Sequence, residues 1–376
     1  GWLDRMDQFR YVSHAQEVIF APGALAQLRE VVDRVGWKRL LLCASGSMKT
    51  NGNVDRVQSI LGENLAAVFD SVRPHVQDVQ VEEAIALARM HDADAVIGLG
   101  GGSPLGMAKA VGFLSALPIL AIPTTYAGSE MTAVYGVTHT QENPPRKVTA
   151  SDPKIAPKLV IYDPELTLDL PPELTASTGI NALAHCIEAL YSVTRHPLST
   201  AAALRGIQHI NNALLGCYQD GGNLEARTEM LIGAHLAGLS LASASMGLHH
   251  GLCHVLGGAA NVPHGIANSI ILPHAIRFNA DATAPQLLPA VEVMGISANG
   301  SRPVMAVELL AQKISELIGS MNLPQRLRDA GVALKESDLP RLAEIAFQNQ
   351  TVQNNPKPIT GSVQIESLLK HGWERR

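Results

Sequence analysis

Four histidines lie in one apolar stretch of this chain, residues 246–264. His250 and His254 are four residues apart, which places both side chains on one face of a helix. His264 follows a proline, so we expect the helix to end before it and His264 to lie in a loop. Neutral imidazoles that converge from a helix and the following loop can ligate a metal or transfer protons.

A second segment, residues 178–188, has the pattern of a capped helix and carries Asn181 and His185 at the same i, i+4 spacing. A lone histidine on an apolar face is more often a structural core residue. Two pairs at helical spacing, with a further histidine after a proline, instead favour a functional cluster of His185, His250, His254 and His264. The chain has no H-E-x-x-H segment, so the pattern does not indicate a zincin protease.

Residues 96–104 read Val-Ile-Gly-Leu-Gly-Gly-Gly-Ser-Pro and predict a strand that turns into a helix. Glycines let backbone amides approach a phosphate, and the helix N-terminus adds partial positive charge. We therefore expect a pyrophosphate site; the alternative is a tight turn without a ligand. The motif is neither the usual dinucleotide fingerprint nor a Walker loop. The residues of this expected site are Gly100, Gly101, Gly102 and Ser103.

The next apolar run also leads into small hydroxyl residues, which can bind ribose or phosphate. Those residues are Thr124, Thr125 and Ser129. The alternative for this segment is an ordinary loop with hydroxyl turns.

Strand and helix signals alternate over the first 163 residues, and helical periodicity dominates afterwards. We expect an α/β Rossmann-like nucleotide-binding domain over residues 1–163 and an all-helical domain over residues 164–376, with the site in a cleft between them. The expected strands are residues 39–44, 66–70, 93–98, 117–122 and 159–162. The expected helices are residues 23–35, 54–61, 79–91, 104–114, 182–191, 200–215, 224–242, 304–318 and 339–347.

Composition bounds the class of protein. Among 376 residues, 46% are hydrophobic and 4% are aromatic, and the net charge is −5 without a long basic run. This composition excludes a nucleic-acid partner. No apolar run is long enough to span a membrane. The four scattered cysteines fit buried free thiols in a reducing compartment. We therefore expect a cytoplasmic protein without membrane or nucleic-acid partners.

Taken in order, these motifs resemble those of the iron-containing (group III) alcohol dehydrogenases over nearly the whole chain. The resemblance rests on residues 100–104, 123–125, 128–130, 163–166, 179–188, 250–265 and 355–358. It implies the fold shared with dehydroquinate synthases, an active site in the cleft, NAD(H) or NADP(H) as coenzyme, and a homodimer. It also implies an iron or zinc site at Asn181, His185, His250 and His264, where the family has one aspartate and three histidines.

The chain departs from the family at two positions that usually carry aspartate, where it has Gly106 and Asn181. Both departures resemble the maleylacetate reductase branch. So do residues 126–130 and 248–258, whereas residues 263–268 resemble the alcohol dehydrogenases more closely. An amide in place of a carboxylate weakens the affinity for a hard ferrous ion, although three imidazoles can still hold zinc. We therefore expect a metal-independent or weakly metal-dependent site.

The resemblance implies reduction of maleylacetate to 3-oxoadipate, a carboxylate substrate from aromatic degradation. We expect His185, His250 and His254 to be catalytic, with His254 supplying the proton. Ser45 stands where NAD-preferring relatives carry aspartate, which leaves the choice between NADH and NADPH open.

The main alternative is a metal-dependent alcohol dehydrogenase that acts on a small alcohol or aldehyde. A lyase like dehydroquinate synthase is less consistent with the few Lys and Arg residues in the motifs. A non-catalytic nucleotide-binding protein is less consistent with the intact histidines.

Overall fold

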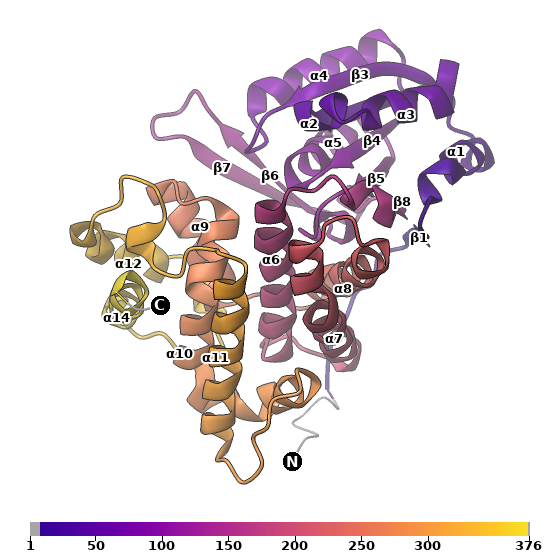
Figure 1. Ribbon diagram of the computed structural model, residues 1–376. Helices are drawn as coiled ribbons and strands as arrows, with labels where there is room; N and C mark the ends of the chain where they lie inside the picture. The colour runs from indigo at the N-terminus through magenta and orange to yellow at the C-terminus, as the bar shows by residue number, and fades with distance from the viewer. Residues whose placement is uncertain (1–7, 375–376) are drawn as a thin grey trace. The chain divides into compact units, whose positions relative to one another are not determined.

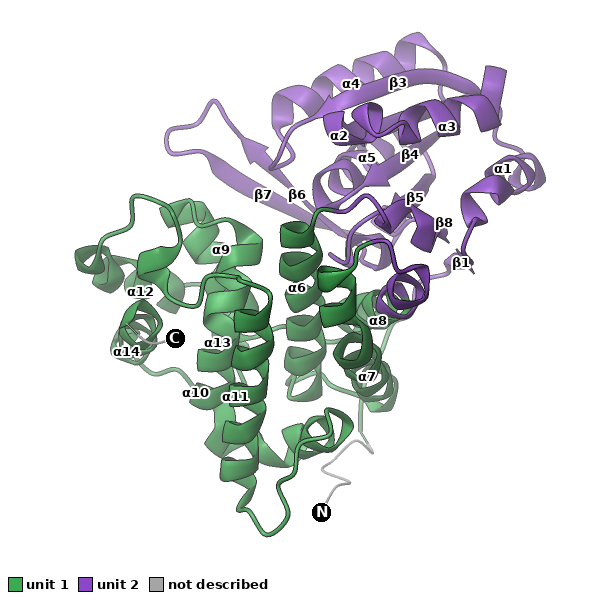
Figure 2. Ribbon diagram, viewed as in Figure 1, with its two compact units in different colours: residues 1–12, 171–221, 232–376 green, residues 13–170, 222–231 purple. Residues whose placement is uncertain are grey.

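The computed structural model describes residues 8–374 and divides into two compact units, each described here by itself (Figure 1, Figure 2). Unit 1 comprises residues 8–12, 171–221 and 232–374. Unit 2 comprises residues 13–170 and 222–231. Unit 2 is built around a parallel sheet, and unit 1 is helical, which confirms the predicted fold class.

The sheet of unit 2 has six parallel strands in the order β1-β8-β5-β4-β2-β3. Their bounds are β1 (Glu17–Phe20), β2 (Leu40–Ser45), β3 (Leu65–Val72), β4 (Ala95–Gly100), β5 (Ile119–Pro123) and β8 (Leu159–Tyr162). The helices of this unit are α1 (Leu28–Val35), α2 (Gly46–Thr50), α3 (Asn53–Leu61), α4 (Asp78–Met90) and α5 (Gly102–Leu114). Short 3-10 turns cover Ala24–Gln27, Gly62–Asn64, Ser129–Met131, Pro153–Ile155 and Pro164–Thr167.

Apolar side chains cover both faces of this sheet. Because successive strand residues point to opposite faces, Leu40 and Leu42 pack in one buried cluster with α1 and α3, whereas Leu41 and Cys43 pack in another with α4 and α5. Burial on both faces explains why the strands are continuous apolar runs that could be recognised in the sequence.

Three strands were not expected from the sequence. β1 is a four-residue edge strand that pairs with β8. An antiparallel hairpin of β6 (Val134–His139) and β7 (Arg146–Ser151) forms a separate two-stranded sheet. The residues of β7 are almost all exposed, so this strand lacks the apolar run that marks a core strand.

Unit 1 consists of helices. Their bounds are α6 (Pro172–Leu190), α7 (Pro197–Gln219), α8 (Leu224–Ser243, which begins in unit 2), α9 (Leu248–Ala260), α10 (His264–Val293), α11 (Pro303–Ser320), α12 (Leu339–Phe347), α13 (Gln350–Gln353) and α14 (Ser362–Glu374). Two 3-10 turns, Leu327–Asp329 and Glu336–Asp338, precede α12. α6 begins six residues before Thr178, so the helix start predicted there was wrong; Pro172 lies in the first turn instead.

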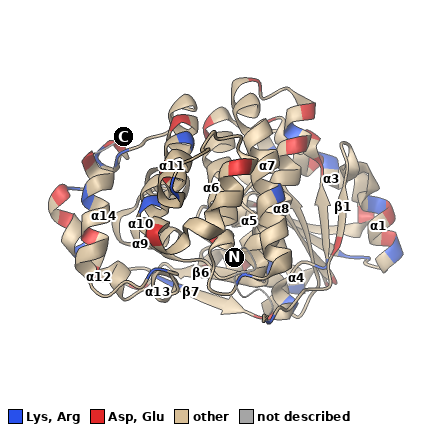
Figure 3. Ribbon diagram, turned by 90° about the horizontal axis from the view of Figure 1, so that it is seen from below, with Lys and Arg blue, Asp and Glu red and all other residues tan. Residues whose placement is uncertain are grey.

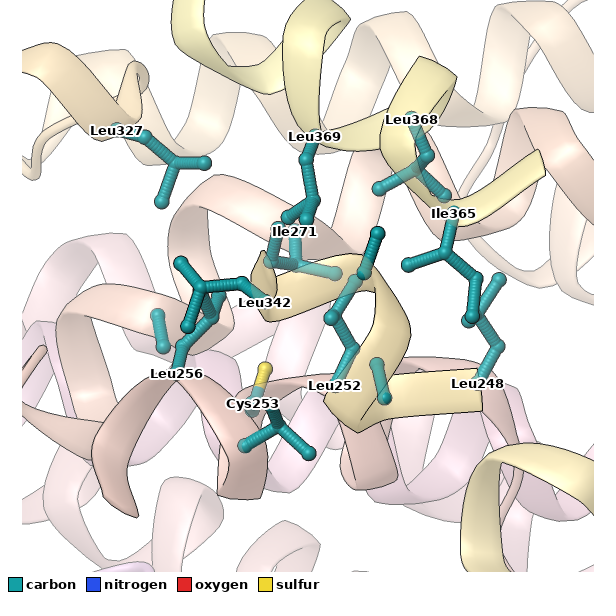
Figure 4. Close-up of a cluster of buried hydrophobic side chains, with 14 of the residues drawn as sticks. Leu248, Leu252, Cys253, Leu256, Ile271, Leu327, Leu342, Ile365, Leu368 and Leu369 are labelled. Atoms are coloured by element: carbon teal, nitrogen blue, oxygen red, sulfur yellow. The ribbon is translucent and has the colours of Figure 1, made fainter. Parts of the chain in front are cut away.

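One face of α9 packs into an apolar cluster of unit 1 (Figure 4). Leu248, Leu252 and Leu256 follow one another at a spacing of four residues and are fully buried. Leu342 of α12 and Leu369 of α14 lie in the same cluster. This packing fixes the rotation of α9 about its axis and turns its opposite face away from the core.

Charged residues of both signs are interspersed along helices such as α1 and α14 (Figure 3). Within residues 8–374 no single helix is long and apolar enough to cross a membrane. Only α8 and α9 taken together meet that criterion, and they are bent by 94°.

Candidate functional site

Three helices of unit 1 bring the predicted histidines together. His185 lies on α6, His250 and His254 lie on α9, and His264 is the first residue of α10. The distance between ring centroids is 4.5 Å for His250 and His254, 5.4 Å for His254 and His264, 5.8 Å for His185 and His250, and 6.3 Å for His250 and His264. We refer to these four residues as the histidine cluster.

The histidine cluster extends from the interior to the surface. His185 is 3% exposed, His250 is half-buried, and His254 and His264 are exposed. The apolar face of α9, with Leu248 and Leu252, faces the core. His250 and His254 each follow one of these leucines by two residues and therefore lie on the other side of the helix. The cluster is therefore accessible to a ligand or water at His254 and His264 and buried at His185.

The loop position predicted for His264 was wrong. Pro263 is extended, with φ −54° and ψ 137°, and serves as the N-cap of α10, whose first residue is His264. A proline ends a preceding helix but is tolerated at the start of the next. The histidine therefore sits on a helix N-terminus, a more rigid support than a loop.

Burial sets the charge of the inner imidazoles. Desolvation lowers the pKa of His185 to about 3, and the neighbouring imidazoles add to this effect. The same causes hold the pKa of His250 well below its usual range. Both rings are therefore neutral at pH 7, and each has one N–H donor and one acceptor nitrogen.

Two observations bear on the predicted metal site. Asn181 is buried, and its Oδ1 accepts a hydrogen bond of 2.8 Å from Nδ2 of Asn268 on α10. Within residues 8–374 no group of three or more His, Cys, Asp or Glu side chains is arranged to hold a metal ion. We derive no chemical step through a metal at Asn181, His185, His250 and His264. Their assignment as metal ligands stays a prediction.

Sequence reasoning did not single out His249 and Asn268, which lie beside the histidine cluster. The buried Nε2 of His249 lies 3.1 Å from the backbone carbonyl of Asn268, and Sγ of Cys253 lies 3.7 Å from the same nitrogen. Asn268 therefore contacts both Asn181 and His249. Their burial is a tertiary feature that spacing along the chain does not reveal.

In unit 2, the residues predicted to bind the coenzyme lie at one edge of the sheet. Ser45 ends β2, Gly100 ends β4, and Thr124 follows β5. These strands are neighbours, with Gly100 opposite Pro123 and Ala44 opposite Leu99, and the amide of Thr124 donates to the carbonyl of Gly100. Ligands of open parallel sheets bind at this carboxyl edge.

The glycine loop has the features of an anion cradle. Gly100 has φ +134°, a conformation that side chains rarely allow, and α5 starts two residues later. No side chain caps the N-terminus of α5, so its first backbone N–H groups can face a phosphate. Thr125 and Ser129, in the loop after β5, are partly buried.

Buried cations hold this second loop in place, which the sequence analysis missed. Nζ of Lys109 on α5 donates to the backbone carbonyl and Oγ of Ser129 and to Oγ1 of Thr132. The fully buried Arg227 donates to the hydroxyl of Tyr126 at 2.9 Å. A lysine between apolar neighbours on a helix was the one available signal for Lys109.

Comparisons with known proteins agree with this architecture. Residues 15–164 match the family described as iron-containing alcohol dehydrogenase, and residues 175–373 match the C-terminal part of the Fe-containing alcohol dehydrogenase family. A maleylacetate reductase of Burkholderia cepacia is 37% identical over 98% of this chain and 99% of its own length.

Two solved structures illustrate the likeness in three dimensions. Maleylacetate reductase of Agrobacterium tumefaciens has a TM-score of 0.87, 33% identity and 98% coverage of both chains. A 1,3-propanediol oxidoreductase has a TM-score of 0.91 and 30% identity, and the match covers 97% of this chain and 100% of that one.

Proposed function

This chain belongs to the iron-containing alcohol dehydrogenase family, and from that premise we propose that it reduces maleylacetate to 3-oxoadipate with NADH or NADPH. Membership makes it an NAD(P)-dependent oxidoreductase. The choice of substrate is the proposal, and it is supported by relatives at about 37% identity over nearly the full length.

One observation carries the proposal: neutral imidazoles converge without a carboxylate among them. Asn181 contributes an amide whose oxygen is already hydrogen-bonded to Asn268. Uncharged imidazoles and an amide do not repel a dicarboxylate, and their N–H groups can donate to oxygen atoms that acquire negative charge.

When bound, the reduced nicotinamide supplies a hydride to the alkene carbon β to the ketone of maleylacetate. The alkene electrons move toward the ketone oxygen, where the N–H groups of His185 and His250 stabilise the enolate. A proton from His254 then completes the new C–H bond at the α carbon. Because His254 is exposed, water can restore its proton after each turnover.

Residues of unit 2 would hold the coenzyme. We propose that Gly100, Gly101, Gly102 and Ser103 bind the pyrophosphate through backbone amides at the start of α5. Thr124, Thr125 and Ser129 would contact the ribose or the phosphates from the neighbouring loop. Ser45, at the end of β2, lies where the adenosine ribose is recognised in related sheets.

The test compares substrates directly. Oxidation of NADH and NADPH is followed with maleylacetate and then with small aldehydes, with and without added zinc or iron. We expect oxidation with maleylacetate and formation of 3-oxoadipate without added metal. Turnover of aldehydes alone, and only with metal, would instead establish the alternative, a metal-dependent alcohol dehydrogenase.

We also propose a homodimer located in the cytoplasm, as expected from the sequence. Light scattering of the purified protein tests the oligomeric state. A monomeric mass at working concentration would contradict it.

A further inference from the structure

The N-terminus of α9, the helix that carries His250 and His254, is capped by side chains distant in the sequence. Oε1 of Glu188 accepts hydrogen bonds from the backbone amides of Gly247 at 3.1 Å and His250 at 2.9 Å. Its Oε2 accepts from the amide of His249 at 3.2 Å. Oδ1 of Asn355 accepts from the remaining amide, that of Leu248, at 3.2 Å.

These contacts account for four successive N–H groups that a helix start leaves without partners in its own backbone. Both acceptors are buried: Glu188 is 1% exposed and Asn355 is 6% exposed. The closeness of both acceptors also explains why residue 247 is a glycine. A Cβ atom there would lie 3.1 Å from both Oδ1 of Asn355 and Oε2 of Glu188.

The same polar network reaches the other helices of the histidine cluster. Glu188 lies on α6, three residues after His185, and thus on the same face of that helix. Asn355 and Asn279 of α10 exchange two hydrogen bonds, 2.7 and 3.0 Å long. The hydroxyl of Tyr191 donates to Oε2 of Glu188 at 3.2 Å.

We propose that Glu188 is the positioning residue of the active site: its carboxylate holds His250, through the backbone of α9, at the distance from His185 that the reaction requires. Asn355 supports it by accepting from the amide of Leu248. This inference deepens the proposed function and rests on it, because it assumes that His185 and His250 act on one substrate.

The physical reason is that the histidine cluster depends on three separate helices. A carboxylate that accepts three backbone N–H groups and carries negative charge at the positive end of α9 resists sliding and rotation of that helix. Displacement of a catalytic group by about 1 Å can lower a rate about a hundredfold.

The test uses Glu188→Gln, which keeps size but places an NH₂ group opposite backbone N–H donors. Its matched control is Asp163→Asn in unit 2. Asp163 is also fully buried and accepts from three backbone amides, those of Gly23, Leu25 and Glu165, none of which lies in α9. Both substitutions therefore exchange a buried capping carboxylate for an amide.

Rates are expressed per bound NADH, so that loss of folded protein does not count as loss of turnover. We expect Glu188→Gln to lower kcat by about tenfold or more, with the KM for NADH within about twofold of wild type. The isotope effect with deuterated NADH should increase, because hydride transfer becomes slower than product release. Asp163→Asn should lower thermal stability and leave kcat and the isotope effect unchanged.

Two further variants keep the test informative if Glu188→Gln does not fold. Gly247→Ala inserts a methyl group between the two caps and should reproduce the kinetic signature. Tyr191→Phe removes a contact of Glu188 that does not involve α9 and should leave kcat within about twofold of wild type.

A readout without substrate separates this inference from the proposed function. In spectra of ¹⁵N-labelled imidazoles, Glu188→Gln or Gly247→Ala should move the His250 and His254 resonances, and Asp163→Asn should not. Failure of wild type to turn over maleylacetate would overturn the proposed function alone. Unmoved resonances, or an unchanged kcat per bound NADH in both α9-cap variants, would overturn the role of Glu188.

Discussion

In our proposal, a single side chain, Asn181, determines which chemistry the histidine cluster supports. An amide brings no charge to the site, and Asn268 already donates to its oxygen at 2.8 Å. A carboxylate at the same place would favour a hard divalent cation and disfavour an anionic substrate. At the residue scale, the site is therefore suited to hydrogen bonding and proton transfer by neutral imidazoles.

The imidazoles of His250 and His254 carry that chemistry in our account. Replacing either one by alanine should lower kcat with maleylacetate by about a hundredfold or more, because polarisation of the ketone or delivery of the proton is lost. Steady-state kinetics, with NADH binding followed by fluorescence, measure this. Turnover close to wild type in His254→Ala would remove that residue from the mechanism.

Ser45 is expected to set the tolerance for NADPH. Its Oγ lies 2.9 Å from Oγ of Ser47, and no carboxylate ends β2 to repel a 2′-phosphate. The side chain of Lys49 is 68% exposed, and its Nζ lies 3.6 Å from Asp70. Ser45→Asp should raise the KM for NADPH by about tenfold, the equivalent of ~1.4 kcal/mol, while the KM for NADH stays constant or falls. An equal effect on both coenzymes would contradict this placement.

At the scale of elements, Lys109 links α5 to the loop that follows β5. It is 1% exposed, and its ammonium group donates to Ser129, Thr132 and the carbonyl of Val134. Burial lowers the pKa of Lys109 to about 7, although Glu130 opposes the shift. The folded protein therefore loses this proton at a lower pH than the unfolded chain does.

The sign of the resulting pH dependence follows from proton binding. Between about pH 7 and the ordinary lysine pKa of 10.5, the unfolded chain binds one more proton at this position, so this lysine adds stability as the pH rises. The difference in free energy of unfolding between wild type and Lys109→Met should rise with pH in that window, by up to about 1.4 kcal/mol per pH unit. Denaturant titrations at several pH values measure the difference. Lys370→Met, at an exposed residue paired with Glu366, is the control and should show no such slope.

The strands and helices differed in how well they could be predicted from the sequence. The central strands β2, β4, β5 and β8 were predicted because burial on both faces makes them continuous apolar runs. β7 was missed because its residues are mostly exposed, and α10 was missed because Pro273, Pro285 and Pro289 argue against a helix.

The site was predicted less completely than the fold. Helical spacing related His250 to His254 and Asn181 to His185, but it could not show that Glu188 meets the start of α9, since that contact joins residues about 60 positions apart. Capping by distant residues has no local signature, so it emerges only from the tertiary structure.

At the scale of the whole molecule, each unit carries one part of the expected chemistry. Unit 2 presents the glycine loop at the carboxyl edge of its sheet, and unit 1 presents the histidine cluster. Each unit also has an apolar core of its own, with the clusters on the two faces of the sheet in unit 2 and the cluster around α9 in unit 1.

All four cysteines, Cys43, Cys186, Cys217 and Cys253, are buried, and Cys43 and Cys253 lie within these cores. Burial raises the pKa of Cys43 and of Cys186 to about 12, so their reactive thiolate forms are scarce at neutral pH. We expect no thiol to react rapidly with a disulfide reagent in the native protein, and all four to react after denaturation. Rapid labelling of a native thiol would show that one of the cores opens readily.

The measurement that tests the central claim most directly is turnover of maleylacetate by chelator-treated enzyme. Protein purified and freed of metal is mixed with NADH or NADPH and maleylacetate, while coenzyme oxidation, 3-oxoadipate and residual metal are quantified together. Our account predicts one 3-oxoadipate formed per coenzyme oxidised, at a rate that chelation does not change. It would be contradicted by a rate that disappears with the metal and returns with added zinc or iron, or by reduction of aldehydes in place of maleylacetate.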